Sequence, residues 1–274
     1  MGKFIDVLAI GAHPDDVDLI CGGTIAKMTS HSRSVVIVDL TRGEMGSRGT
    51  PEEREREARV AADKLGVRDR FSLDLGDGVL ENTSDNRRKL IEIIRNYRPT
   101  LILTHHWTDL HPDHAQAGQM IRDIMYPVGF ARYPAGGEPF RPNEVLFFMG
   151  HTPFVPDFIV DIDDFHDQKK AAIRCFASQF GERDVEDVPT GISEPGFMEM
   201  IEARARYFGS LIGRTFGEPF AVTRPVPMYD PVEHYERFPK IFSSKSWHSH
   251  RLRSDSSRGS KPSETNVDDL EVKE

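Results

Sequence analysis

Short apolar runs alternate with amphipathic segments along most of this 274-residue chain. The run 34–40 contains Val-Val-Ile-Val, and the run 100–104 reads Thr-Leu-Ile-Leu-Thr. Both have the length and β-branched content of strands that are buried on two faces. Such strands are typical of parallel sheets, because the helix that links two parallel strands covers a face of the sheet. The alternation therefore predicts an α/β fold, with a mostly parallel sheet and helices on both faces. Further strands are expected at 4–10, 144–149 and 158–162.

Helices are expected between these strands. Residues 50–53 read Thr-Pro-Glu-Glu, a capping box with proline at the first helical position. A helix should run from there to Leu65, with Gly66 as its stop. The segment 85–97 repeats apolar side chains at helical spacing and ends before Pro99. Two more amphipathic helices are expected at 164–180 and 196–212.

The last stretch of the chain has a different composition. Residues 243–274 include 9 serines among 32 residues, and large apolar residues are scarce after Trp247. A segment of this kind cannot bury enough apolar surface to offset the entropy of ordering it. We therefore expect one folded domain over residues 1–242 and a polar, disordered tail over residues 243–274.

The overall charge limits the classes of partner. The chain has 35 Lys+Arg and 44 Asp+Glu, a formal net charge of −9. Proteins that coat nucleic acid or anionic membranes need a surplus of basic residues, so neither partner is expected. Asp6 interrupts the apolar run that a signal peptide needs, and no stretch approaches the ~20 apolar residues of a membrane span. A cytoplasmic location is therefore expected.

Three loops that follow expected strands are rich in His, Asp and Arg. Residues 11–16 read Gly-Ala-His-Pro-Asp-Asp, and residues 41–49 read Thr-Arg-Gly-Glu-Met-Gly-Ser-Arg-Gly. Residues 105–114 read His-His-Trp-Thr-Asp-Leu-His-Pro-Asp-His. Ligands of open parallel sheets bind beyond the carboxyl ends of the strands. We expect these loops to meet at one edge of the sheet and to form a site there.

The first loop has the residue types of a divalent-metal site. Imidazole nitrogens and carboxylate oxygens bind ions of the zinc type, and a catalytic site leaves one position for water. His13 and Asp16 are three residues apart, so they lie on one side of a turn that enters a helix. Asp15 would then be free to act as a base toward water. The alternative is a plain helix N-terminus, where proline and aspartate are common.

The second His-Pro-Asp sequence favours the metal site. His111 and His114 are again three residues apart, and Asp113 lies between them. With His114 as third ligand, the site would have two imidazoles, one carboxylate and water. His111 would then be an acid near the metal, oriented and kept protonated by Asp113. Zinc suits this set, and Fe(II) would bind the same ligands. The alternative is a solvated loop with spare histidines.

A pair of glycines, Gly22 and Gly23, lies in the helix expected after the first loop. Each costs ~1 kcal/mol there relative to alanine, which suggests close backbone packing, with a ligand as one candidate. The Gly-x-Gly-x-x-Gly fingerprint of dinucleotide binding does not follow the first strand, so a nucleotide cofactor is not expected.

The quoted motifs resemble those of a known family. Ala-His-Pro-Asp-Asp at 12–16, Gly-Gly-Thr at 22–24 and His-Pro-Asp-His at 111–114 resemble the PIG-L/LmbE-like zinc-dependent N-acetylglucosamine deacetylases. The similarity extends over about residues 4–228. More narrowly, the chain resembles the bacillithiol-pathway branch, the N-acetylglucosaminyl-malate deacetylases. This narrower likeness rests on residues 46–50, Arg54, residues 202–209 and residues 217–220.

The resemblance implies roles for the residues of the first loop and for one of the second. His13, Asp16 and His114 match the zinc ligands of the family. Asp15 matches the general base that takes a proton from the attacking water.

It also implies roles for residues around this centre. His111, with Asp113 as its partner, matches the group that stabilises the oxyanion and can protonate the leaving amine. Tyr207 matches a tyrosine near the oxyanion, and Arg54 matches a substrate-binding arginine. Arg48 is a further candidate, since a guanidinium suits a carboxylate such as malate. Without the resemblance, Arg54 would be read as part of the solvated, charged face at 52–59.

The resemblance finally implies a single Rossmann-like domain, a small amino-sugar substrate and a homo-oligomer, either a trimer or a hexamer. The expected reaction removes the N-acetyl group from an N-acetylglucosamine conjugate, with N-acetylglucosaminyl-malate as the first candidate. Other candidate substrates are a chito-oligosaccharide, a glycolipid precursor, an inositol-linked sugar and a thiol conjugate. From another class, a metal- or sugar-binding protein without turnover stays open.

Overall fold

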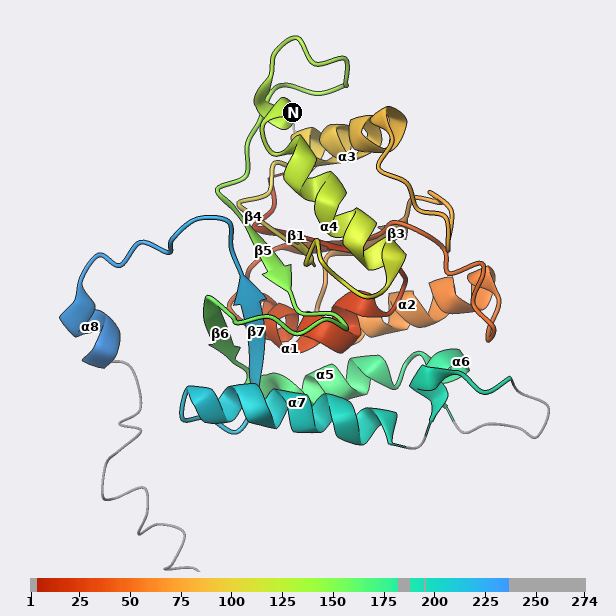
Figure 1. The fold of residues 1–274 in the computed structure, drawn as a ribbon, viewed down its shortest axis with the longest axis vertical. Helices are drawn as coiled ribbons and strands as arrows, with labels where there is room; N and C mark the ends of the chain where they lie inside the picture. Colours follow the sequence, from red (N-terminus) through yellow and green to blue (C-terminus); the bar gives the residue numbers. More distant parts are fainter. Residues whose placement is uncertain (1–3, 182–187, 195, 237–274) are drawn as a thin grey trace, which may run out of the picture.

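The computed structural model describes residues 4–181, 188–194 and 196–236. Within them, seven strands form one sheet in the order β3-β2-β1-β4-β5-β7-β6 (Figure 1). Strand β7 runs antiparallel to both of its neighbours, and every other pairing is parallel. The predicted mostly parallel sheet is thus confirmed. The strands are β1 (Val7–Gly11), β2 (Val35–Asp39), β3 (Asp69–Ser72), β4 (Leu101–His105), β5 (Glu144–Phe148), β6 (Phe158–Asp161) and β7 (Gly217–Ala221).

Helices cover both faces of the sheet, as predicted (Figure 1). The α-helices are α1 (Asp16–Ser30), α2 (Pro51–Leu65), α3 (Ser84–Tyr97), α4 (Pro112–Ile124), α5 (His166–Ile173), α6 (Ala177–Phe180), α7 (Phe197–Leu211) and α8 (Pro231–Glu236). Side chains alternate along a strand, so Leu8 and Ile10 of β1 face α3 and α4. Val7 and Ala9 face α1, α2 and α5 on the other side. The two cores therefore lie above and below one sheet.

Two strands and one helix differ from the sequence-based expectations. Strand β3 reads Asp-Arg-Phe-Ser, and β7 reads Gly-Glu-Pro-Phe-Ala, so neither has the β-branched content of a typical strand. Both form because neighbouring strands pair with them: β2 pairs with β3, and β5 and β6 pair with β7. The helix expected over 164–180 is wrong as one element, because α5 ends at Ile173 and α6 begins at Ala177.

The other expectations have mixed outcomes. Helix α2 has the expected boundaries: Thr50 and Glu53 form the capping box, and Gly66 ends the helix at φ 70°. The predicted tail over 243–274 lies outside the described residues, so its boundary stays a prediction. Among the helices that the structure describes, none combines the length and the apolar character needed to span a membrane.

Helix α1 is broken at Cys21, whose φ of −130° is not helical. The break frees the backbone N–H groups of Gly23 and Thr24, which donate to the carboxylate of Glu218 on β7 at 3.0 and 2.7 Å. Lys169 on α5 completes a buried ion pair with Glu218 at 2.7 Å. A carboxylate suits the amino end of the second half of the helix. The close packing predicted at the glycine pair is confirmed, because a Cβ at Gly22 would lie 3.3 Å from Lys169 and one at Gly23 would lie 2.7 Å from Ile162.

We expect Lys169→Met to lower the free energy of unfolding by about 3 kcal/mol, because Glu218 stays buried without its counter-ion. The backbone hydrogen bonds to Glu218 remain, so the expected loss lies at the low end of the range of about 3–5 kcal/mol that is typical when one partner of a buried ion pair is removed. Denaturant unfolding at pH 7 measures it. Arg206→Met removes an exposed pair with Glu202 and is the matched control, with a much smaller expected effect. Equal losses in the two variants would contradict this account.

Candidate active site

The carboxyl ends of β1 and β4 bring the three predicted metal ligands together. His13 lies in the turn after β1, Asp16 begins α1, and His114 lies in the first turn of α4. Because β1 and β4 are parallel neighbours, both turns lie at the same edge of the sheet. One ligand atom from each residue lies within 4.8 Å of the others. The expected convergence of the two His-Pro-Asp loops is what the structure shows.

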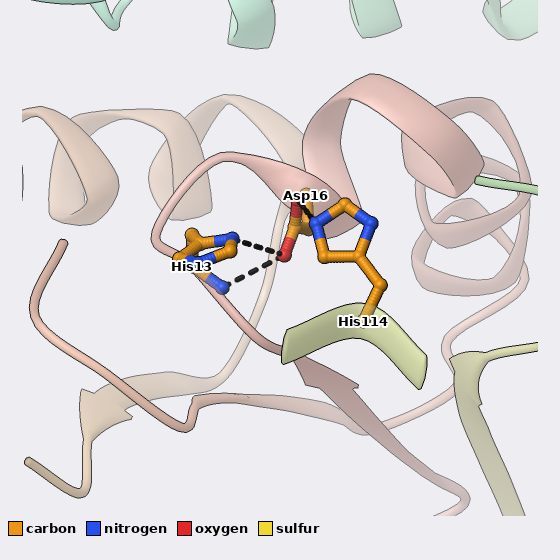
Figure 2. Close-up of side chains that lie close together, drawn as sticks. All are labelled: His13, Asp16 and His114. Carbon is orange, nitrogen blue, oxygen red and sulfur yellow. Dashed lines mark hydrogen bonds and ion pairs between the residues drawn. The ribbon is translucent and has the colours of Figure 1, made fainter. Parts of the chain in front are cut away.

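Figure 2 shows Asp16 between the two imidazoles. Its carboxylate oxygens lie 3.4 Å from His13 Nδ1 and 3.1 Å from His114 Nε2. His105, fully buried, supports Asp16 from behind with its Nε2 at 3.0 Å from the carboxylate. Burial and the charge of His114 lower the pKa of His105 to about 4, so this imidazole is neutral. His105 therefore supports the carboxylate of Asp16 as a neutral imidazole.

The far nitrogen of each candidate imidazole ligand faces a further carboxylate. His13 Nε2 lies 3.1 Å from Asp77 and 3.3 Å from Asp113. His114 Nδ1 lies 3.2 Å from Asp109. Carboxylates in this position fix the imidazole ring and leave its other nitrogen for a metal. The donor set therefore fits a zinc-type ion, with His13 Nδ1, His114 Nε2 and Asp16 as ligands.

The electrostatics of the cluster also suit a cation. Burial alone would lower the pKa of His114, but the charge of Asp16 and hydrogen bonds with Asp109 and Asp16 raise that pKa to about 9. The charge of Asp16 likewise overcomes burial at His13 and raises its pKa well above the usual value. Without a metal, the imidazoles of His13 and His114 thus attract protons, which a bound dication would displace.

Asp109 is a candidate site residue that the sequence does not single out. It accepts from the backbone N–H of His111 at 2.9 Å and of His151 at 2.8 Å, besides facing His114. Although burial acts against it, the hydrogen bond with His114 holds the pKa of Asp109 well below its usual range. Asp109 lies in the loop 105–114 that the sequence singles out, but no spacing rule separates it from a solvated aspartate.

We expect Asp109→Asn to weaken metal affinity by about 10- to 100-fold, the usual cost of losing a carboxylate behind a histidine ligand. The asparagine oxygen can still accept from the backbone N–H of His111, whereas the amide group that replaces the other oxygen cannot accept from that of His151. Competition with a chromophoric chelator measures the affinity. An unchanged metal affinity would show that Asp109 does not act through His114.

Asp15 faces the same cavity and is held by an arginine. It precedes α1 as the N-cap residue, and Arg54 Nη2 from α2 lies 3.3 Å from its carboxylate. Arg54 Nη1 also donates to the carbonyl of Gly43 at 3.1 Å. Gly43 has φ +67°, and a Cβ there would collide with Arg54 Nη1, so this position requires glycine. Arg54 is only 4% exposed, which overturns its reading as part of a solvated face.

His111 lies beside the candidate ligands. Its ring centroid is 4.8 Å from that of His13 and 4.6 Å from that of His114. Burial, with the nearby charges of His114 and His13, lowers the pKa of His111. Its Nδ1 accepts from the backbone N–H of Asp113 at 3.3 Å. The expected pairing is thus corrected in two respects. The backbone of Asp113, not its carboxylate, orients His111, and the lowered pKa of His111 runs against the expectation that Asp113 keeps it protonated.

The carboxylate of Asp113 serves another part of the site. It accepts from the backbone N–H of Gly78 at 2.7 Å and of Leu80 at 3.3 Å, and it faces His13. It therefore connects the loop after β3 to the metal trio, the three candidate ligands His13, Asp16 and His114. Asp77, which also faces His13, belongs to that loop. The composition of β3 does not predict a strand, so the sequence does not indicate that the residues after it belong to the site.

One cavity of about 810 Å³ is lined by the candidate ligands and by the charged groups nearest to them, namely His13, Asp15, Asp16, Arg54, Asp77, His111 and His114. Tyr207, on α7, also lines it. Arg204 on the same helix donates to the carbonyls of Met149 and Gly150, which follow β5, and so holds α7 against the site. Arg48 is not among the described lining residues, and its guanidinium donates to the carbonyl of Gln179 at 3.3 Å. A substrate contact by Arg48 stays a prediction.

Comparison with known proteins identifies the family. A model described as PIG-L, GlcNAc-PI de-N-acetylase, matches residues 8–125, which span β1 to α4 and hold all three candidate ligands. A diacetylchitobiose deacetylase of Thermococcus kodakarensis is 32% identical over 227 residues, which cover 77% of this chain and 80% of the relative. The chain belongs to the PIG-L family. The expected membership in this family of metal-dependent deacetylases is confirmed.

Other relatives of this PIG-L protein support the fold and show a second activity. The crystal structure of a conserved protein of Thermus thermophilus superposes with a TM-score of 0.76 at 38% identity, covering 83% of this chain and 98% of that one. A 4-oxalmesaconate hydratase of Pseudomonas putida is 29% identical over 196 residues, covering 63% of this chain and 73% of the relative. The narrower likeness to N-acetylglucosaminyl-malate deacetylases stays a prediction.

Proposed function

We propose that this PIG-L protein hydrolyses the acetamide of an N-acetylglucosamine conjugate and releases acetate and a free amine. The observation that supports this best is the shared cavity of Asp15, His111 and the buried trio His13, Asp16 and His114. Amide hydrolysis needs a base for water, a polarised carbonyl and an acid for the departing nitrogen. The cavity offers a candidate group for each task.

In this proposal His13, Asp16 and His114 hold a divalent ion, zinc or Fe(II). When bound, such an ion supplies Lewis-acid polarisation of the carbonyl and lowers the pKa of water toward ~7. Asp15 accepts the proton of the attacking water, and its ion pair with Arg54 fixes the direction of the carboxylate.

The oxyanion and the leaving group require further residues. His111 stabilises the developing negative charge on the carbonyl oxygen, with Tyr207 as an assisting group from α7. Asp15, which took a proton from the attacking water, then delivers it to the departing nitrogen, so that the amine leaves neutral, while His111 keeps its own proton as a hydrogen-bond donor. Asp113 positions His111 through its backbone N–H.

Metal analysis combined with acetate release tests the function. The zinc-loaded protein should release acetate from N-acetylglucosaminyl-malate, from diacetylchitobiose or from an inositol-linked N-acetylglucosamine faster than from free N-acetylglucosamine. Metal binding without acetate from any of these would favour the non-catalytic alternative. Conversion of an unsaturated polycarboxylate by hydration would favour the second activity seen among the relatives.

The malate aglycone, the first candidate from the sequence, is one finer hypothesis to test, and it depends on Arg54. We expect Arg54→Ala to lower kcat on every accepted substrate, because Asp15 loses the partner that orients it. If Arg54 also binds malate, KM should rise for the malate glycoside alone. Steady-state kinetics on the malate and methyl glycosides separates the two effects. An unchanged KM for the malate glycoside would remove the carboxylate contact.

The expected homo-oligomer, trimer or hexamer, stays a prediction that sedimentation velocity can test. The cytoplasmic location likewise stays a prediction.

A further inference from the structure

Apolar side chains from three elements line the active-site cavity, and we call them its apolar wall. Helix α7 supplies most of them, the first half of α1 supplies two, and one follows β5. They are Leu19, Ile20, Met149, Phe197, Met200, Ile201 and Phe208. Sugar hydroxyls need hydrogen-bond partners, which these side chains lack. The wall therefore has the chemistry to bind something other than the sugar ring.

The charges that line the cavity do not favour an acidic aglycone on this wall. Among the described lining residues the lysine and arginine side chains are those of Arg54 and Arg204. Arg54 is engaged by Asp15 and the Gly43 carbonyl, and Arg204 by the carbonyls that follow β5. A dicarboxylate would have to compete with these partners, whereas an apolar group would need no cation.

The size of the cavity indicates that a substrate extends beyond the sugar. A cavity of about 810 Å³ lies in the upper part of the range of sites that bind drug-sized molecules. Three of its lining side chains are also strongly exposed: Met45 at 72%, Met200 at 54% and Tyr207 at 60%. When a ligand covers apolar surface of this kind and removes it from water, the free energy of the complex falls and binding is favoured.

We propose that the wall of α7 and α1, continuous with the metal trio, is a subsite for an alkyl or aryl aglycone of the N-acetylglucosamine conjugate. This inference rests on the proposed function, because the metal trio and Asp15 determine where the acetamide lies. The aglycone then extends along Met200 and Ile201.

A series of alkyl β-N-acetylglucosaminides tests the subsite. With the zinc-loaded protein, kcat/KM should rise from methyl to butyl to hexyl, by at most about fourfold for each methylene that is buried. The malate glycoside should be a poorer substrate than the hexyl glycoside. A flat series, or a malate glycoside that exceeds every alkyl glycoside, would overturn the proposal.

Two substitutions on α7 provide a matched pair. Met200→Gln keeps the length of a half-exposed side chain but adds an amide to the wall, so the hexyl-to-methyl ratio of kcat/KM should fall several-fold. Leu211→Gln changes an exposed apolar residue of the same helix that is not a described lining residue, and the ratio should stay at the wild-type value. Each ratio compares two substrates on the same variant, so a loss of activity that affects both substrates equally leaves the ratio unchanged. Equal ratios in the two variants would contradict the subsite.

A binding measurement separates the subsite from the proposed reaction. Calorimetric titration of the zinc-loaded protein with the product amines, methyl and hexyl β-glucosaminide, should give a lower Kd for the hexyl compound. If no glycoside releases acetate but this difference appears, the proposed function fails and the apolar subsite stands. If acetate is released but neither Kd nor kcat/KM depends on the alkyl chain, the function stands and the subsite fails.

Discussion

Asp15→Asn should lower kcat by about three orders of magnitude while the protein keeps its metal. The substitution retains the shape of the side chain and an oxygen that can accept from Arg54, but it removes the group that takes a proton from water. General bases contribute about 10²- to 10⁴-fold, so a loss of this size is expected for the base itself. Acetate release under saturating substrate, with metal content measured on the same sample, gives both values.

A carboxylate elsewhere in the chain provides the control for Asp15. Asp85 lies exposed in the first turn of α3, and Asp85→Asn should leave kcat and metal content unchanged. If Asp15→Asn instead lost its metal, Asp15 would be a ligand rather than the base. If it kept both metal and full activity, another group would have to take the proton.

His114→Ala should abolish both stoichiometric metal binding and activity. The imidazole lies 3.1 Å from Asp16 and is the only one of the proposed ligands that α4 supplies. Its loss leaves one imidazole and one carboxylate, so the affinity should fall by more than the ~10- to 100-fold expected for Asp109→Asn. Equilibrium dialysis against zinc measures the stoichiometry.

Folding of this variant must be checked separately, since His114 is buried. Circular dichroism and denaturant unfolding should show a native-like transition. A folded His114→Ala protein that retains one tightly bound zinc per chain would remove His114 from the ligand set.

The sequence predicts the centre of the site better than its surroundings. His13, Asp16 and His114 could be found because turns after parallel neighbouring strands must meet at one edge. Asp77 follows β3, whose composition does not predict a strand. The sequence therefore does not place the loop of Asp77 at the edge of the sheet. Asp109 lies in a loop already singled out, yet only coordinates show that it faces His114.

Arg54 illustrates a different limit. Its place in a charged run predicts a solvated side chain, and nothing local indicates burial. The structure buries it because the left-handed turn at Gly43 and the carboxylate of Asp15 together enclose the guanidinium. Partners that are distant in the sequence determine whether such a side chain is buried. The pairing of β7 with β5 and β6 is another example, because Gly217 and Pro219 weaken every local strand signal.

The break in α1 has a consequence for the order in which the chain acquires activity during synthesis. All three candidate ligands have been translated by residue 114, about a hundred residues before the ribosome reaches Glu218. Until then the backbone N–H groups at Gly23 and Thr24 lack their acceptor, and the helix that begins with Asp16 is left with uncapped donors beside the sheet. A nascent chain that ends after α4 should therefore carry all three candidate ligands and still lack a finished active site.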